Sequence, residues 1–164
     1  MPPLPSKMRQ VIFDGAGGPE VVKLAQADVP TPGAGKVLVE VAAFGINRPD
    51  CAQRAGAYPP PPGETQVPGL EIAGRIVAVG PDVTGLKVGD EICALVGSGG
   101  YAEYALADAA LCLLEVEDDI PPRSAFRIDP SRATIDMPRI MDAIRVGNED
   151  RARRRSVAAA VQVE

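Results

Sequence analysis

Short runs of apolar and β-branched residues, separated by turn-forming residues, dominate the first hundred positions of the chain. The clearest run is 36–43, where apolar side chains surround Glu40 and a glycine follows within two residues. Short strands between Gly- and Pro-rich turns predict a mainly β fold, a partly open barrel with short helices. The other predicted strands are 7–13, 21–27, 72–79 and 91–96.

The segment 44–63 interrupts this strand pattern and predicts a short helix followed by a stiff loop. Pro49 stands where the first turn of a helix tolerates a proline, and Gly56 stands where a helix would end. Tyr58 then precedes four prolines, 59–62, which cannot supply the backbone donors of a sheet. A strand therefore delivers polar residues to the start of a short helix, beside a rigid loop.

The polar residues of this segment are the candidate site, because functional groups concentrate on irregular backbone held by a rigid scaffold. Asn47, Arg48 and Asp50 lie at the predicted helix start, and Tyr58 lies on the loop. The alternative is that Asn47 and Asp50 only cap the helix, as such residues often do. Glu71 is either a paired structural acid or an acid of the cleft.

Composition indicates a globular protein and excludes several classes of function. The chain has 164 residues, 46% of them hydrophobic, and a net charge of −5, which argues against nucleic-acid or anionic-membrane partners. Three cysteines without Cys-x-x-Cys spacing predict neither a disulfide framework nor a zinc knuckle. The chain contains no apolar stretch long enough to span a membrane and no signal-peptide core at its start, so we expect a cytoplasmic protein.

Charge divides the chain into two predicted parts. Residues 1–120 carry 8 basic and 16 acidic side chains, whereas residues 121–164 carry 9 basic side chains, all arginine, and 6 acidic ones. We expect a folded domain at 1–120 and a poorly packed Arg-rich tail, or short helices, at 121–164. A shifted reading frame in GC-rich coding sequence is one hypothesis for the tail.

A glycine-rich stretch at 97–102 fits the pattern G-x-G-x-x-A of dinucleotide-binding turns. Glu117 lies about twenty residues further on, where a Rossmann unit keeps its ribose-binding acid. The residues beyond it are too few for the remaining strands and helices of such a fold. We therefore interpret 97–102 as a structural loop and expect no Rossmann domain within the 164 residues.

A series of motifs across residues 8–120 resembles one enzyme family. They are Gly17-Gly18-Pro19-Glu20, Asn47-Arg48-Pro49-Asp50, Gln53 to Gly63, Gly69 to Gly74, Val88-Gly89-Asp90 and Gly99 to Tyr104. The set resembles zeta-crystallin-type quinone oxidoreductases, p53-inducible branch, of the medium-chain dehydrogenase/reductase superfamily. The resemblance implies a GroES-like domain for 1–120, in agreement with the strand pattern.

The resemblance also implies a zinc-free site. Zinc-dependent members of the superfamily place Cys at position 47 and His at positions 52 and 70, where this chain has Asn47, Ala52 and Leu70. The chain contains no histidine. Catalytic zinc needs about three protein ligands, so no metal is expected.

Two functional hypotheses follow from the resemblance. In the first, the chain is the N-terminal part of an NADPH-dependent quinone oxidoreductase, with Asn47 and Tyr58 as catalytic residues and Asn47, Arg48 and Asp50 contacting the cofactor, inactive on its own. In the second, it is a non-catalytic GroES-like module that binds planar ligands, forms a homo-oligomer or associates with a full-length relative. The first hypothesis expects a small planar quinone-like substrate.

Overall fold

The computed structural model describes residues 3–114 of the 164-residue chain. The expectations for the Arg-rich tail at 121–164 therefore lie outside the described residues, as does Glu117. Within the described part, no helix is long and apolar enough to cross a membrane.

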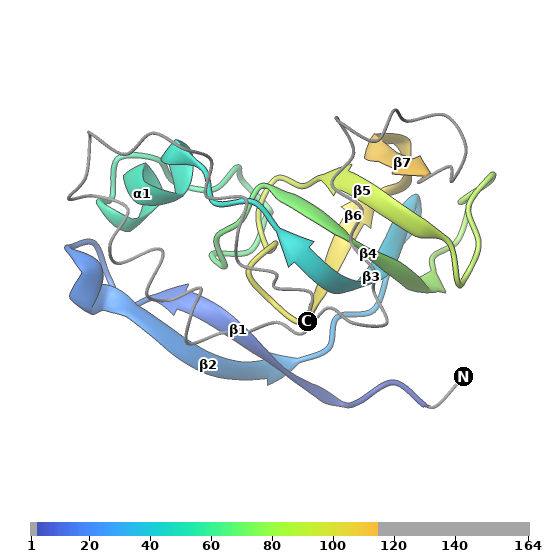
Figure 1. Ribbon diagram of the computed structural model, residues 1–164, viewed down its shortest axis with the longest axis horizontal. Helices are drawn as coiled ribbons and strands as arrows, with labels where there is room; N and C mark the ends of the chain where they lie inside the picture. The colour runs from blue at the N-terminus through green and yellow to red at the C-terminus, as the bar shows by residue number, and fades with distance from the viewer. Residues whose placement is uncertain (1–2, 115–164) are drawn as a thin grey trace, which may run out of the picture.

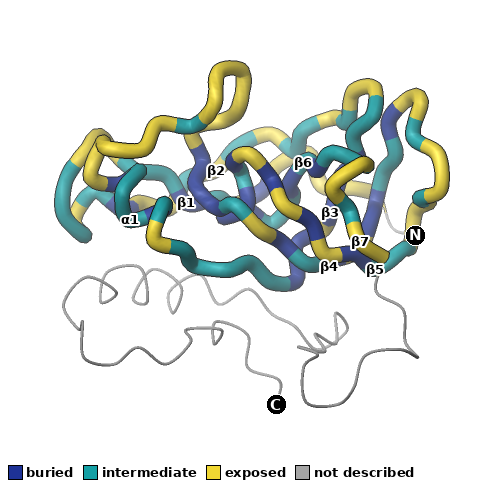
Figure 2. The backbone as a smooth tube through the Cα atoms, turned by 90° about the horizontal axis from the view of Figure 1, so that it is seen from above, coloured by how far each residue is buried: buried dark blue, intermediate teal, exposed yellow. Residues whose placement is uncertain are grey.

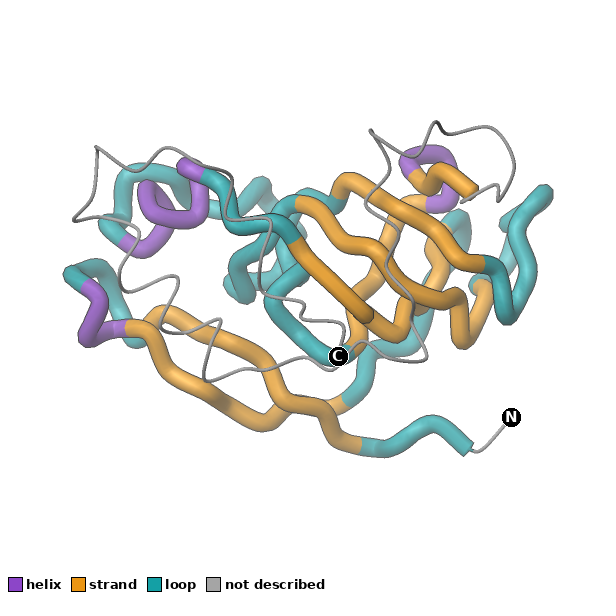
Figure 3. Tube along the Cα trace, in the orientation of Figure 1, coloured by secondary structure: helices purple, strands orange, loops and turns teal. Residues whose placement is uncertain are grey.

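Two antiparallel sheets, one α-helix and two short 3₁₀ helices make up residues 3–114 (Figures 1 and 3). The smaller sheet is a hairpin, and the larger sheet has five strands in the order β6-β3-β4-β5-β7. In chain order the elements are β1 (Lys7–Phe13), η1 (Pro19–Val21), β2 (Val22–Asp28), β3 (Lys36–Phe44), α1 (Arg48–Arg54), β4 (Glu71–Val79), β5 (Glu91–Leu95), β6 (Tyr104–Asp108), η2 (Ala109–Leu111) and β7 (Cys112–Leu114).

The prediction of a mainly β fold with a short helix is confirmed. All five predicted strands are present, with bounds that differ by one residue at most at either end. The two sheets do not close into one continuous barrel. They are joined by an isolated bridge between Gln10 and Ala102 and by the Val11 N–H, which donates to the Tyr101 carbonyl at 2.8 Å.

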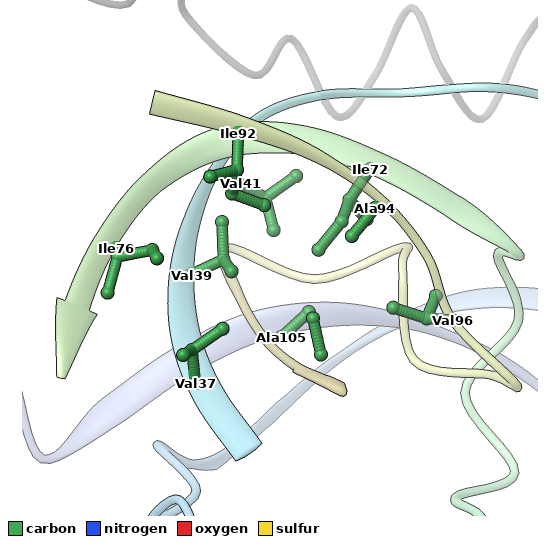
Figure 4. Close-up of a cluster of buried hydrophobic side chains, with 10 residues drawn as sticks. Val37, Val39, Val41, Ile72, Ile76, Ile92, Ala94, Val96 and Ala105 are labelled. Carbon is green, nitrogen blue, oxygen red and sulfur yellow. The ribbon is translucent and has the colours of Figure 1, made fainter. Parts of the chain in front are cut away.

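The main core lies on the inner face of the five-stranded sheet. Val37, Val39 and Val41 alternate inward along β3; on the opposite face Glu40 is exposed, whereas Leu38 and Ala42 are also buried. Figure 4 shows them meeting side chains from β4, β5 and β6, and Figure 2 shows the same strands as the buried centre of the molecule. The other core members are Ile72, Ile76, Ile92, Ala94, Val96, Ala105 and Ala107.

A second, smaller core ties the hairpin to the region around α1. Val11 and Val22 of the hairpin pack with Val67 and with Tyr101, whose side chain is fully buried. Phe44 lies against Tyr101, with ring centroids 4.5 Å apart. Through the Tyr101 hydroxyl, which donates to Asp50 of α1 at 2.7 Å, this cluster fixes the backbone that carries the candidate site.

The glycine-rich stretch 97–102 is a structural loop, as the sequence analysis interpreted it. Three successive backbone N–H groups are used within the fold: those of Gly99, Gly100 and Tyr101 donate to the carbonyls of Val67, Gly69 and Pro68 at 2.7, 3.1 and 2.9 Å. The chain then continues into strand β6 rather than a helix. The Gly99, Gly100 and Tyr101 amides are therefore not available to a phosphate, and no helix N-terminus follows the loop.

Candidate functional site

The start of α1 is built by its own polar residues. Asn47 is the N-cap, in extended backbone, and Pro49 occupies the first turn. The backbone N–H of Asn47 donates to Asp50 Oδ2 at 2.6 Å, and the two residues form a capping box. Helix α1 ends before Gly56, whose φ of +79° lies in the left-handed region. The predicted helix bounds are thus confirmed.

Asp50 is a buried carboxylate rather than a surface cap. Its side chain is 1% exposed, and Oδ2 accepts a second hydrogen bond, from the hydroxyl of Tyr101 at 2.7 Å. Oδ1 has no aligned hydrogen-bond partner. Burial raises the pKa of Asp50, while the Tyr101 hydroxyl and the Asn47 and Gly69 amides counteract that rise in pKa. Burial and the neighbouring Asp50 carboxylate also raise the pKa of Tyr101.

The side chain of Asn47 is held by Glu71, at the first position of β4. Asn47 Nδ2 donates to Glu71 Oε1 at 2.9 Å. Glu71 lies next to Gly45, whose missing side chain leaves the required space: a Cβ at position 45 would be 1.9 Å from Glu71 Oε1. The turn after β3 and the start of β4 therefore form one unit around Asn47.

Arg48 and Tyr58 are the exposed members of the predicted set. Arg48 is exposed and has no ion pair or hydrogen bond with the described residues. Tyr58 is 44% exposed and follows α1 at the start of the proline run. Both are therefore accessible to a ligand, whereas Asp50 acts through the Asn47 backbone.

A buried arginine connects α1 to the hairpin. Arg54 is 2% exposed, and its Nη1 donates to the Gly17 carbonyl at 2.8 Å. The Gly17 N–H in turn donates to the Arg54 carbonyl at 2.9 Å. Figure 1 shows α1 above the η1 end of the hairpin, where this pair lies. The Gly17-Gly18-Pro19-Glu20 motif thus anchors the helix that carries the site.

Tyr101, Phe44 and Gly45 are parts of this region that the sequence analysis did not assign to the site. Tyr101 lies 51 residues from Asp50, and only the fold brings its hydroxyl to that carboxylate. The sequence offered one signal: a tyrosine in a glycine-rich loop has a polar tip, which needs a partner when the ring is buried. Glu71, for which the sequence left a paired structural acid and a cleft acid open, is paired with Asn47.

Among residues 3–114, no group of three His, Cys, Asp or Glu side chains is arranged to hold a metal ion. Catalytic zinc takes about three such ligands plus water.

We expect the purified protein to carry no stoichiometric zinc. Elemental analysis by plasma mass spectrometry after dialysis measures this directly, with the same protein incubated with excess zinc and dialysed again as the matched sample. One zinc per chain surviving dialysis in either sample would contradict the zinc-free assignment.

Comparison with known proteins agrees with this geometry. Residues 33–118 match the alcohol dehydrogenase GroES-like domain. A quinone oxidoreductase of Lama guanicoe is 47% identical over 103 residues, which are 61% of this chain and 31% of that protein. A quinone oxidoreductase structure from Pseudomonas syringae has a TM-score of 0.62 and 32% identity, covering 70% of this chain and 35% of the other.

A mycobacterial structure complexed with NADPH is also similar, with a TM-score of 0.59 and 34% identity over 70% of this chain and 34% of the other. The matched fold and motifs define an alcohol-dehydrogenase-like GroES domain. The chain belongs to the GroES-like domain family of alcohol dehydrogenases, within the medium-chain dehydrogenase/reductase superfamily, and its homologues include quinone oxidoreductases. It spans about a third of the length of the curated relatives that it matches.

Proposed function

We propose that this chain supplies the quinone-facing wall of an NADPH-dependent, zinc-independent quinone oxidoreductase. The observation that carries the proposal is the immobilised Asn47, whose backbone is bonded to Asp50 and whose side chain is bonded to Glu71. Preorganised hydrogen-bonding groups of this kind orient a ligand without a reorganisation cost. Residues 1–120 form the GroES-like unit in this proposal, and 121–164 are a separate tail.

The four predicted site residues divide into three roles. Asn47 and Tyr58 contact the ligand: the amide donates to a carbonyl oxygen, and the half-exposed ring stacks on a planar quinone. Arg48 is exposed beside them and is the cation available to a cofactor phosphate. Asp50 is buried, so its part is to hold the Asn47 backbone.

The described residues fit one end of NADPH. Asn47 and Tyr58 suit the nicotinamide ring, whereas the Gly99, Gly100 and Tyr101 amides of the glycine-rich loop are bonded within the fold and are not available to the pyrophosphate. When bound, the cofactor supplies the hydride. The protein groups on this wall orient the quinone and hold its oxygen.

A second candidate function is a binding module without catalysis. It is supported by the glycine-rich loop, whose Gly99, Gly100 and Tyr101 amides are bonded within the fold rather than free for a cofactor phosphate. A module of this kind would bind planar carbonyl compounds at Asn47 and Tyr58, or associate with a full-length relative or a second copy.

We expect the 164-residue chain to bind tetramethyl-1,4-benzoquinone without oxidising NADPH. The ring substituents of this quinone block thiol addition to the three cysteines. The Tyr58→Ala variant should weaken binding by about 2- to 10-fold, because aromatic pairs contribute about 0.5–1.5 kcal/mol. Tyr104→Ala, on β6, is the matched control and should bind normally.

Two measurements check this expectation. Chemical-shift titration of the Asn47 amide reports binding, and NADPH absorbance reports turnover. Saturable NADPH oxidation that falls in Tyr58→Ala would show that the chain is catalytic on its own. An unperturbed Asn47 signal at saturating quinone would remove the proposed binding function.

A further inference from the structure

Asn47 is held from three directions, and together these contacts determine what its side chain can offer. Its backbone N–H donates to Asp50 Oδ2 at 2.6 Å, and Tyr101 fixes that carboxylate from the other side at 2.7 Å. In the first turn of α1, its backbone carbonyl accepts from the Asp50 N–H at 3.1 Å. Its Nδ2 donates to Glu71 Oε1 at 2.9 Å. Backbone and side chain are therefore both fixed.

The chemistry of Glu71 decides which way the Asn47 amide faces. An ionised carboxylate has only acceptors, so it requires the NH₂ end of the amide and excludes the carbonyl end. The Oδ1 of Asn47 then faces the first turn of α1, as the capping box requires. Glu71 takes one of the two Nδ2 hydrogens, and the second remains as a donor of fixed direction.

The position of the Glu71 carboxylate is itself determined by the fold. Glu71 begins β4, and the Gly45 N–H donates to its backbone carbonyl at 3.3 Å. A Cβ at position 45 would be 1.9 Å from Oε1, 2.6 Å from Cδ and 2.8 Å from Cγ of Glu71. Any side chain at position 45 would thus displace the carboxylate, which makes Gly45→Ala a way to move Glu71 without removing its charge.

We propose that Glu71 is a positioning residue that holds the Asn47 amide so that it presents only an N–H donor to a ligand. The site therefore selects neutral planar ligands bearing a carbonyl oxygen. The proposal rests on the proposed function, because it specifies the ligand chemistry of the same site. A carbonyl accepts the remaining Nδ2 hydrogen. A carboxylate ligand is disfavoured because it would lie beside the Glu71 charge.

The experiment compares tetramethyl-1,4-benzoquinone with its reduced hydroquinone form, in the full chain, by chemical-shift titration. The oxidised form has carbonyl oxygens, which only accept, whereas the hydroquinone has phenolic hydroxyls, which also donate and whose oxygens accept more weakly. We expect the quinone to bind about 2- to 10-fold more tightly, the value of one hydrogen bond of about 0.5–1.5 kcal/mol. In Glu71→Gln this preference should disappear, because glutamine can both donate and accept and lets the Asn47 amide turn over.

Three further samples make the result specific to Glu71. Gly45→Ala should lose the preference in the same way, because it displaces the carboxylate. Glu91→Gln is the matched control: Glu91 pairs with Arg75 on the same sheet, at 2.9 Å, and should leave the preference intact. In the ligand-free protein, the hydrogen-bonded Asn47 side-chain proton should shift in Glu71→Gln and stay in place in Glu91→Gln.

The outcomes distinguish failure of the proposed function from failure of the positioning role of Glu71. An Asn47 side-chain signal unchanged by Glu71→Gln, or a quinone preference unchanged in that variant at an unchanged melting temperature, overturns the positioning role of Glu71. Failure of both ligands to perturb wild-type Asn47 overturns the proposed function and the ligand selection together. A signal that moves in ligand-free Glu71→Gln, with the preference lost, supports the inference.

Discussion

Replacing Tyr101 by alanine is expected to lower the free energy of unfolding by about 3–5 kcal/mol, the cost of truncating a buried aromatic side chain. Tyr101 is fully buried, contacts Phe44, and belongs to the core that joins the hairpin to α1. The truncation also removes the hydroxyl that donates to the buried Asp50 carboxylate. The total free energy of unfolding of a small domain is only about 5–15 kcal/mol. Urea denaturation followed by circular dichroism measures the loss.

Tyr101→Phe separates packing from hydrogen bonding, because it removes only the hydroxyl. We expect a loss of about 1–3 kcal/mol near neutral pH, the value of one hydrogen bond to a charged group, because Asp50 Oδ2 keeps its other bond from the Asn47 N–H. A loss as large as that of Tyr101→Ala would contradict the packing role of the ring. No loss at all would contradict the Asp50–Tyr101 contact.

The stability loss in the same variant should depend on pH, because the pKa of Asp50 is raised in the folded protein. Because the folded-state pKa of Asp50 is raised, this group makes the protein more stable as pH falls through that pKa, and the gain is lost as pH rises again. Tyr101 counteracts the rise in pKa, so Tyr101→Phe should raise it further. The difference in free energy of unfolding between wild type and Tyr101→Phe should therefore decrease as the pH falls from neutral towards about pH 4, near the ordinary pKa of Asp. In an Asp50→Asn background this pH dependence should be absent.

Replacing Gly74 by alanine is expected to lower the free energy of unfolding by about 3 kcal/mol, as for severe overpacking of a core. Gly74 lies in the middle of β4, opposite Val41 of β3. A Cβ there would be 2.1 Å from the Glu40 carbonyl oxygen and 3.0 Å from its carbon. Both are backbone atoms, so neither can swing away, and the β3–β4 pairing must move.

Gly33→Ala is the matched control for this substitution. A Cβ at Gly33 would meet no atom within 4 Å, and Gly33 has no positive φ. We expect its stability to change by less than about 1 kcal/mol. Equal effects of the two substitutions in thermal melts would show that loss of glycine flexibility, rather than the approach of β3 to β4, explains the result.

The sequence by itself determined the strands whose side chains follow a clear pattern. The β-rich run around Glu40 gave β3, and Pro49 with Gly56 gave the bounds of α1, because these signals depend on neighbouring residues alone. The family motifs, read in order, also indicated the GroES-like domain that the comparisons show.

The last two strands could not be predicted in the same way. The Ala-rich stretch that contains β6 has a residue composition suited to a helix, and it becomes a strand because β3 offers it a partner from Lys36 to Glu40. Strand β7 has three residues and pairs at the edge with β5. Pairing with a strand far away in the chain decided both cases.

The candidate site, too, could be predicted from the sequence only in part. Asn47, Arg48, Asp50 and Tyr58 could be chosen from the sequence because they surround one helix start and one rigid loop. The sequence could not predict how far each of these side chains is exposed. Asp50 is buried, whereas Arg48 is exposed, because the Tyr101 ring and hydroxyl, from a distant part of the chain, pack against Asp50. Glu71 reaches Asn47 across 24 residues, through the pairing of β3 with β4. Local signals determine which polar groups lie at the site, and only long-range packing determines which of them remain free to meet a ligand.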